Sequence, residues 1–315
     1  MCIGIAMVIK EGIFIPFYIN GNNSHNDIRK KYHLTDINFE TLPIEFHCNG
    51  YLTNWEDWEY HVDINHELPQ WYNRASVQYK AACTEVLKQI IEKINETGIY
   101  IGNLNLIGTQ ITSLGNLQQC GDLYLRGTPI VSLGNLQQCG YLDLEGTQII
   151  SLGNLQQCDY LNLSDTPITS LGNLQQCEDL NLSNTLVTSL GNLQQCDDLD
   201  LRGTPITSLG NLQQCDDLDL SNTLVTSLGN LQQCDDLDLR GTSITSLGNL
   251  QICGDIDLED TQIASLGNLQ QCGDLCLRGT LIVSLENLRQ LQEHKLQVLV
   301  IYNNAGTFIL EAHKL

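Results

Sequence analysis

The chain has 315 residues, with 37 acidic and 15 basic side chains and a formal net charge of −22. This charge disfavours direct binding of nucleic acid, because phosphates must be neutralised by lysine and arginine. Apolar runs are too short to span a membrane, and the first is broken by Lys10 and Glu11, unlike that of a signal peptide. The 13 cysteines, an odd number, indicate a reducing compartment, so we expect a cytoplasmic protein.

The first hundred residues contain no repeat and predict a small α+β domain over residues 1–98. Two apolar runs around Lys10-Glu11-Gly12 indicate a β-hairpin, and Ser24 is suited to cap a short helix. An apolar face with helical spacing follows Ser76, and we expect this helix to cover the open end of the array that follows. The predicted elements are strands Cys2–Lys10 and Gly12–Asn20, a helix from Ser24 to Lys31, strands Phe39–Tyr51 and Trp55–Val62, and a helix from Ser76 to Asn95.

A 19-residue repeat, written CxxLxLxxTxIxSLGNLQQ, extends from Ile101 to Leu291. Its Leu-x-Leu pair is typical of a strand with one buried face, and a fixed period this short indicates one supersecondary unit stacked many times. We expect one strand per coil in a parallel sheet, with strands about 4.8 Å apart and with the cysteines buried as small apolar residues. The nine repeat cysteines are Cys120, Cys139, Cys158, Cys177, Cys196, Cys215, Cys234, Cys253 and Cys272.

The repeat resembles the leucine-rich repeat family, whose LxxLxLxxNxL segment it matches with cysteine in the first leucine position and threonine in the asparagine position. Its second half, SLGNLQQ, resembles the short bacterial subtype. The resemblance implies an α/β solenoid over residues 99–291 with a concave parallel sheet. Ten Leu-x-Leu pairs give ten coils. The coil departs from the family in its length: 19 residues leave no room for a convex helix of normal length, so we expect a mostly extended convex side, with a C-terminal cap over residues 292–315. A three-sided parallel β-helix is the alternative, but it needs three strands per coil and only one strand pattern is present.

Acidic side chains concentrate on the sheet face that points away from the buried leucines. Residues 101–291 contain 22 acidic and 5 basic residues, which supply −17 of the net charge. We name the residues before the first leucine of each pair the first column, and the residues between the two leucines the second column. The predicted contact residues are Tyr124, Tyr141, Asp143, Tyr160, Asp179, Asp198, Asp200, Asp217, Asp219, Asp236, Asp238, Asp255 and Asp257.

This acidic face has several explanations. Stacked like charges destabilise a sheet, so their presence favours a function, the binding of a basic partner. One alternative is that the surface is acidic only for solubility. Another is that recent duplication of 38-residue pairs copied the same aspartates many times. The densest block has two aspartates in each of three coils, with Arg202 and Arg240 beside it to offset the repulsion. The three tyrosines are either anchors for a partner or residues that pack beneath the N-terminal domain.

The N-terminal region resembles a module that precedes repeat arrays in predicted proteins of bacteriophages and bacteria and has no settled activity. The resemblance implies a bacterium or a virus-infected host cell as the source. The matching pieces are Ser24-His25-Asn26-Asp27-Ile28, Trp55-Glu56-Asp57-Trp58 with Val62-Asp63, and Leu68-Pro69-Gln70-Trp71-Tyr72.

Catalytic motifs are sparse in this region. Met1-Cys2 is similar to the start of amidotransferases that use an N-terminal cysteine nucleophile, but the expected glycine stands at position 4, and Cys2 also fits the start of a buried strand. The histidines lack a metal-ligand spacing such as HExxH, so no metal, cofactor or catalytic residue is predicted. These histidines are His25, His33, His47, His61 and His66.

The sequence therefore predicts a non-enzymatic scaffold that binds a basic protein through the acidic face, either as a phage-derived mimic of nucleic acid or as a modulator of a host protein. One alternative is a hydrolase or amidotransferase that uses Cys2, with the repeats as a targeting module. The other is a structural rod stabilised by cations.

Overall fold

The computed structural model describes residues 4–22, 24–34, 40–64, 67–282, 299–303 and 306–310. These residues form two compact units, Met1–Ile149 with Gly153–Leu155, and Ile150–Leu152 with Gln156–Leu315. Within the described ranges, no helix is both long and apolar enough to cross a membrane. The expected boundary at residue 98 and the cytoplasmic location both stay predictions.

The N-terminal region folds into a four-stranded antiparallel sheet with the strand order β2-β1-β3-β4. The predicted hairpin is confirmed, because Lys10 of β1 pairs with Ile13 of β2. The strands are β1 (Ile5–Lys10), β2 (Ile13–Phe17), β3 (Thr41–Cys48) and β4 (Trp58–Val62), and a short 3₁₀ turn, η2 (Trp55–Asp57), precedes β4.

Two helices accompany this sheet, α1 (His25–Lys31) and α2 (Gln70–Thr97). The predicted cap of α1 is confirmed, because Oγ of Ser24 accepts a hydrogen bond from the Asp27 amide. Helix α2 begins at Gln70 rather than near Ser76 because it contains a non-helical residue, Ala75, so the regular apolar period starts only after that break. It ends at Gly98, whose φ of +69° is the left-handed conformation that favours glycine at a helix end.

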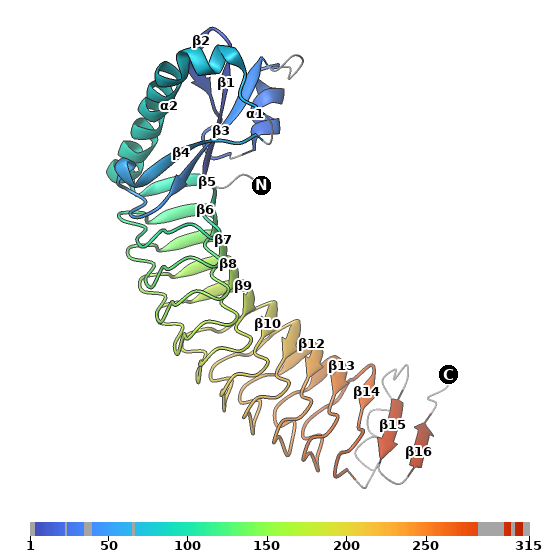
Figure 1. The fold of residues 1–315 in the computed structure, drawn as a ribbon. Helices are drawn as coiled ribbons and strands as arrows, with labels where there is room; N and C mark the ends of the chain where they lie inside the picture. Colours follow the sequence, from blue (N-terminus) through green and yellow to red (C-terminus); the bar gives the residue numbers. More distant parts are fainter. Residues whose placement is uncertain are drawn as a thin grey trace. The chain divides into compact units, whose positions relative to one another are not determined.

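The two helices lie on opposite faces of the N-terminal sheet (Figure 1). Helix α1 packs its buried Ile28 against Ala6 and Val8 of β1. On the other face, the Tyr72 hydroxyl of α2 lies 3.2 Å from the hydroxyl of Tyr60 on β4. Glu45 pairs with Ala6 and with His61. Paired residues share a face of the sheet and successive residues alternate, so Glu45 and His61 lie on the α1 face.

The repeats form a ten-stranded sheet in which β5 to β14 follow one another in chain order. Equivalent residues pair in parallel one coil apart, as Leu199 does with Leu218. The predicted parallel-strand solenoid with coils of 19 residues is therefore confirmed. The strands are β5 (Ile99–Asn105), β6 (Gln119–Tyr124), β7 (Gln138–Asp143), β8 (Gln157–Asn162), β9 (Gln176–Asn181), β10 (Asp198–Asp200), β11 (Asp217–Asp219), β12 (Gln233–Asp238), β13 (Ile252–Asp257) and β14 (Leu275–Cys276).

The structure corrects the predicted α/β class, because the solenoid is almost entirely β. Between consecutive strands the described residues form turns and extended chain without a helix. The threonine that recurs in each coil holds these turns. Oγ1 of Thr147 donates to the Leu144 carbonyl at 2.7 Å, and Thr128 and Thr204 make the same bond in other coils. A short period thus leaves room for side-chain-bonded turns and for little else.

All nine repeat cysteines are buried in the solenoid interior, which confirms their predicted orientation. Their thiols also donate hydrogen bonds: Sγ of Cys139 lies 3.3 Å from the Gly121 carbonyl and 3.2 Å from the Tyr141 carbonyl. Cysteine is both apolar and a weak donor, so it can occupy the buried position of the first leucine and still make these contacts.

The N-terminal domain is joined to the first coil mainly through loops. The Leu52 amide donates to the Ser113 carbonyl at 2.8 Å, and the Thr112 amide donates to the Gly50 carbonyl at 2.9 Å. Gly4 bridges to Asn105 of β5. Loop backbone therefore supplies these bonds, in addition to helix α2, which runs into the coil through Gly98.

The last described elements are β15 (Leu299–Asn303) and β16 (Gly306–Leu310), which pair as an antiparallel hairpin. Two apolar stretches lie in the predicted C-terminal cap, Leu296–Ile301 and Phe308–Leu310; β15 covers the second half of the first and β16 contains the second, while residues 296–298 lie outside the described chain. Strand β15 lies beside β14. The role of this hairpin as a C-terminal cap remains a prediction.

Candidate binding surface

The first column forms a continuous ladder of aspartates in the second unit. Asp198 pairs in register with Asp179 and Asp217, and Asp217 pairs with Asp236, which pairs with Asp255. Asp198, Asp217, Asp236 and Asp255 are exposed, and Asp179 is half-buried. Strand spacing places such partners about 4.8 Å apart along the ladder, so the structure brings the predicted first-column residues together as expected.

Like charges perturb this ladder. The pKa values of Asp198, Asp217 and Asp236 are raised above the usual range, first by partial desolvation and then by repulsion from neighbouring carboxylates. Among the described residues, no lysine or arginine forms a salt bridge with these three aspartates. The first column therefore presents uncompensated negative charge to solvent.

The second column is less exposed and has a structural role. The side chains of Asp200, Asp219 and Asp238 are 22%, 28% and 20% exposed. Each accepts a hydrogen bond from the backbone amide two residues later, as Oδ1 of Asp219 does from Ser221 at 2.9 Å. Asparagine makes the same bond at Asn181, so the position requires a side-chain oxygen and not a charge.

Asp143 shows this role most clearly. It was predicted to be a contact residue, but only 8% of it is exposed, and its Oδ1 accepts a hydrogen bond from the Glu145 amide at 3.1 Å. This hydrogen bond at the end of the strand accounts for the aspartate without a role in binding another protein. The structure thus removes Asp143 from the exposed surface.

Arginines partly compensate the second column by bridging adjacent coils. The guanidinium of Arg202 bonds Asp200 of its own coil, and its Nε lies 3.3 Å from Oδ2 of Asp219 in the next coil. Arg240 holds Asp238 in the same way, with its Nε 3.6 Å from Oδ2 of Asp257. Of the six aspartates in the densest block, those of the second column are therefore largely paired, and those of the first column are not.

A further acidic column was missed from the sequence. The residue directly after a repeat cysteine also lies on the outer face, and we name these residues the third column. Five of them are acidic and exposed: Asp159, Glu178, Asp197, Asp216 and Asp235. The cysteine and the first leucine are both buried although they stand three positions apart. Strict alternation cannot place both inside, so two consecutive residues face outward.

Hydrogen bonds show how the strand accommodates the extra outward residue. The amides of Asp216 and Asp217 both donate to the Asp197 carbonyl, each at 2.9 Å. This shared acceptor interrupts the regular ladder between the cysteine and the leucine. The CxxL spacing, which is incompatible with a pure period of two, was the sequence signal for the third column.

Two hollows lie in the second unit along these columns. One, of about 430 Å³, is lined by Asp236, Asp238, Asp255, Asp257 and Asp274 together with apolar residues of the same strands. The other, of about 470 Å³, is lined by glutamines and by Asp159, Glu178 and Asp197. Both hollows can admit long basic side chains between carboxylates.

The three predicted tyrosines are half-buried. The rings of Tyr124 and Tyr141 lie 4.9 Å apart between centroids, so the structure brings these two together as a small aromatic surface. Tyr160 stands in the second unit. The alternative nucleophile, Cys2, lies outside the described residues, as does His66.

Comparison with known protein families finds no family that matches this chain. Comparison with curated proteins finds no significantly similar sequence.

Proposed function

We propose that this protein is a non-enzymatic binding scaffold that holds a basic protein partner on its acidic sheet face. The first column carries the proposal, because Asp198, Asp217, Asp236 and Asp255 are exposed and in register. None of these four forms a salt bridge with lysine or arginine among the described residues. A basic segment that crosses the strands would meet a carboxylate about every 4.8 Å. Such complementarity accelerates encounter and selects for partners of opposite charge.

The third column extends this contact surface beside the first column within the second unit. In this proposal the solenoid is a leucine-rich repeat array whose strand face is concave, preceded by an N-terminal cap. A regular line of negative charge is what a protein that neutralises phosphates with lysine and arginine recognises, so a protein that ordinarily binds nucleic acid is the partner class that fits best. The setting is the cytoplasm of a bacterium or of an infected host cell.

Two matched variants test the proposal, and each removes three negative charges. The first-column variant is Asp198→Asn, Asp217→Asn and Asp236→Asn; the second-column control is Asp200→Asn, Asp219→Asn and Asp238→Asn. The fold tolerates the control, because Asn162 and Asn181 occupy equivalent positions. The measurement is affinity for poly-L-lysine, and for basic proteins captured from cell lysate, at several salt concentrations.

We expect the first-column variant to bind about tenfold more weakly and with a flatter salt dependence, because exposed uncompensated charges dominate attraction to a cationic partner. We expect the control to bind nearly as well as the parent, because its carboxylates are already paired with arginine. Equal binding by the parent and the first-column variant would show that the acidic face serves solubility only.

A further inference from the structure

A cluster of histidines and carboxylates lies on the α1 face of the N-terminal sheet. Strand register places Glu45 opposite His61 and His47 opposite Glu59, and side chains two positions apart on one strand share a face. Asp63 directly follows β4, where its amide donates to the Pro43 carbonyl at 3.0 Å. The alternation of side chains along β3 and β4 thus places these polar groups on one surface, beside the start of α1.

His25, the first residue of α1, is held in one orientation at this surface. It is only 7% exposed, and its Nε2 lies 3.1 Å from the Ile44 carbonyl oxygen. A carbonyl only accepts, so Nε2 carries the proton and Nδ1 of the neutral ring offers a lone pair.

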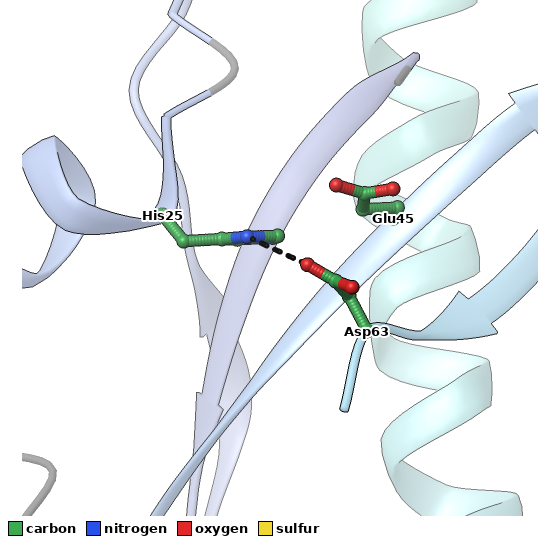
Figure 2. A group of neighbouring side chains, drawn as sticks. All are labelled: His25, Glu45 and Asp63. Atoms are coloured by element: carbon green, nitrogen blue, oxygen red, sulfur yellow. Dashed lines mark ion pairs between the residues drawn. The ribbon is translucent and has the colours of Figure 1, made fainter. Parts of the chain in front are cut away.

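The lone pair of His25 faces a carboxylate, with Nδ1 3.6 Å from Oδ2 of Asp63 (Figure 2). With the ring neutral, both atoms are electron-pair donors, and one cation can bind both of them. Two ligands about 2.1 Å from an ion, at a tetrahedral angle, lie about 3.4 Å apart. The observed separation is close to that expected for two ligands of one metal ion.

Glu45 completes the donor set. Its side chain is only 9% exposed, and its Oε2 lies 2.9 Å from Nε2 of His47. One nitrogen of His25 and one carboxylate oxygen each of Glu45 and Asp63 lie within 4.8 Å of one another. The Ile44 carbonyl and His47 are partners of the kind that orient metal ligands from outside the coordination sphere.

We propose that His25, Glu45 and Asp63 bind a single divalent transition-metal ion, with Zn²⁺ as the best fit. One imidazole and two carboxylates suit zinc in a three-ligand site. Two carboxylates balance the charge of the ion, which offsets the cost of burying Glu45. Asp63 is exposed on the solvent side, where the fourth position is open to water or to a group from a partner.

The spacing rules for metal motifs missed this set because the ligands come from three elements. His25 opens a helix, Glu45 lies within β3 and Asp63 follows β4. The prediction that the protein has no metal site is replaced by this proposal. It is independent of the acidic sheet face, so either proposal can fail alone.

The test uses the metal-free full-length protein, titrated with Zn²⁺ by calorimetry and followed by thermal unfolding. We expect one ion per chain and a rise in Tm, because a ligand specific to the native state stabilises it. Asp63→Asn changes an exposed position that tolerates substitution. It should weaken Zn²⁺ binding by at least about tenfold, because even the loss of a group that only hydrogen-bonds a ligand costs about tenfold or more. Glu45→Gln should do the same.

Glu59→Gln is the matched control, because Glu59 lies on the same strand and only 3.6 Å from His61 but outside the ligand set; it should bind Zn²⁺ as the parent does. Substitution with Co²⁺ gives a second readout, since thiolate ligation produces an intense charge-transfer absorption that a site of nitrogen and oxygen donors lacks. Absence of Zn²⁺ binding would overturn the proposal. So would binding that survives Asp63→Asn, or that depends on Cys276 beside Asp257 and Glu259.

Discussion

Nε of Arg202 lies 3.3 Å from Oδ2 of Asp219, a residue of the next coil, while the same guanidinium bonds Asp200 of its own coil. One arginine therefore bridges two stacked carboxylates and offsets half of their charge. Arg240 repeats the arrangement with Asp238 and Asp257. This partial compensation reduces the repulsion within the second column, whereas the first column has no such bridges among the described residues.

Loss of these bridges should destabilise the solenoid. Arg202→Gln leaves Asp200 and Asp219 as adjacent uncompensated charges, and we expect a loss of about 0.5–1 kcal/mol in the free energy of unfolding, a modest value because the guanidinium is largely exposed. Urea unfolding at low and high salt measures the effect, which should shrink with screening. Arg74→Gln, an equal charge change on α2, is the control; an equal loss there would contradict the bridging role.

The first column should make stability depend on pH. The pKa values of Asp198, Asp217 and Asp236 are raised in the folded protein. At pH values between the ordinary and the raised pKa, the folded state therefore binds more protons than the unfolded state. Their contribution is therefore favourable at low pH and is lost as pH rises through the raised pKa values. His25, whose pKa is lowered, acts in the opposite direction below its usual pKa.

A difference measurement isolates the aspartates. The first-column variant should be more stable than the parent at pH 7, and the difference should shrink as pH falls toward the ordinary aspartate pKa of about 3.9. Chemical unfolding of both proteins across this range provides the comparison. A constant difference would show that carboxylate repulsion does not contribute.

Repeat thiols should be unreactive in the native protein. They are buried, and burial raises the pKa of Cys177 and of Cys272 to about 12, so the reactive thiolate is scarce at neutral pH. Cys276, which is half-buried, should react before them. Labelling with a thiol reagent, mapped by mass spectrometry with and without urea, tests this order; rapid native labelling of most repeat cysteines would refute their inward orientation.

Gly102 should be essential for joining the N-terminal domain to the first coil. A Cβ built there would lie 1.8 Å from Cα of Gly21, a backbone atom, so Gly102→Ala should destabilise the protein by about 1–3 kcal/mol or more through overpacking. Gly108→Ala is the control: its φ of +66° is strained but nothing lies within 4 Å, so about 1–2 kcal/mol is expected from conformation alone. Thermal unfolding of both variants gives the comparison, and a smaller effect at Gly102 would contradict the close approach.

Local pattern predicted the repeat unit well. The alternation at Leu199 and Leu201 and the recurring Thr204 each depend on neighbours within one coil, so the strand and its turn could be deduced from a single copy. The start of α2 was misplaced because Ala75 interrupts the helical period. The third column was missed because a shared acceptor at the Asp197 carbonyl breaks the alternation on which strand patterns depend.

The sequence by itself determined the period, the buried cysteine and leucine columns and the acidic character of one face, because these follow from regular spacing and composition. Only the tertiary structure decided which carboxylates are free. Arg202 reaches across coils, and Asp143 is buried by its surroundings. Tertiary structure likewise brought together His25, Glu45 and Asp63. These residues are distant in sequence, and the distances between them are set by strand register and by the packing of α1 on the sheet.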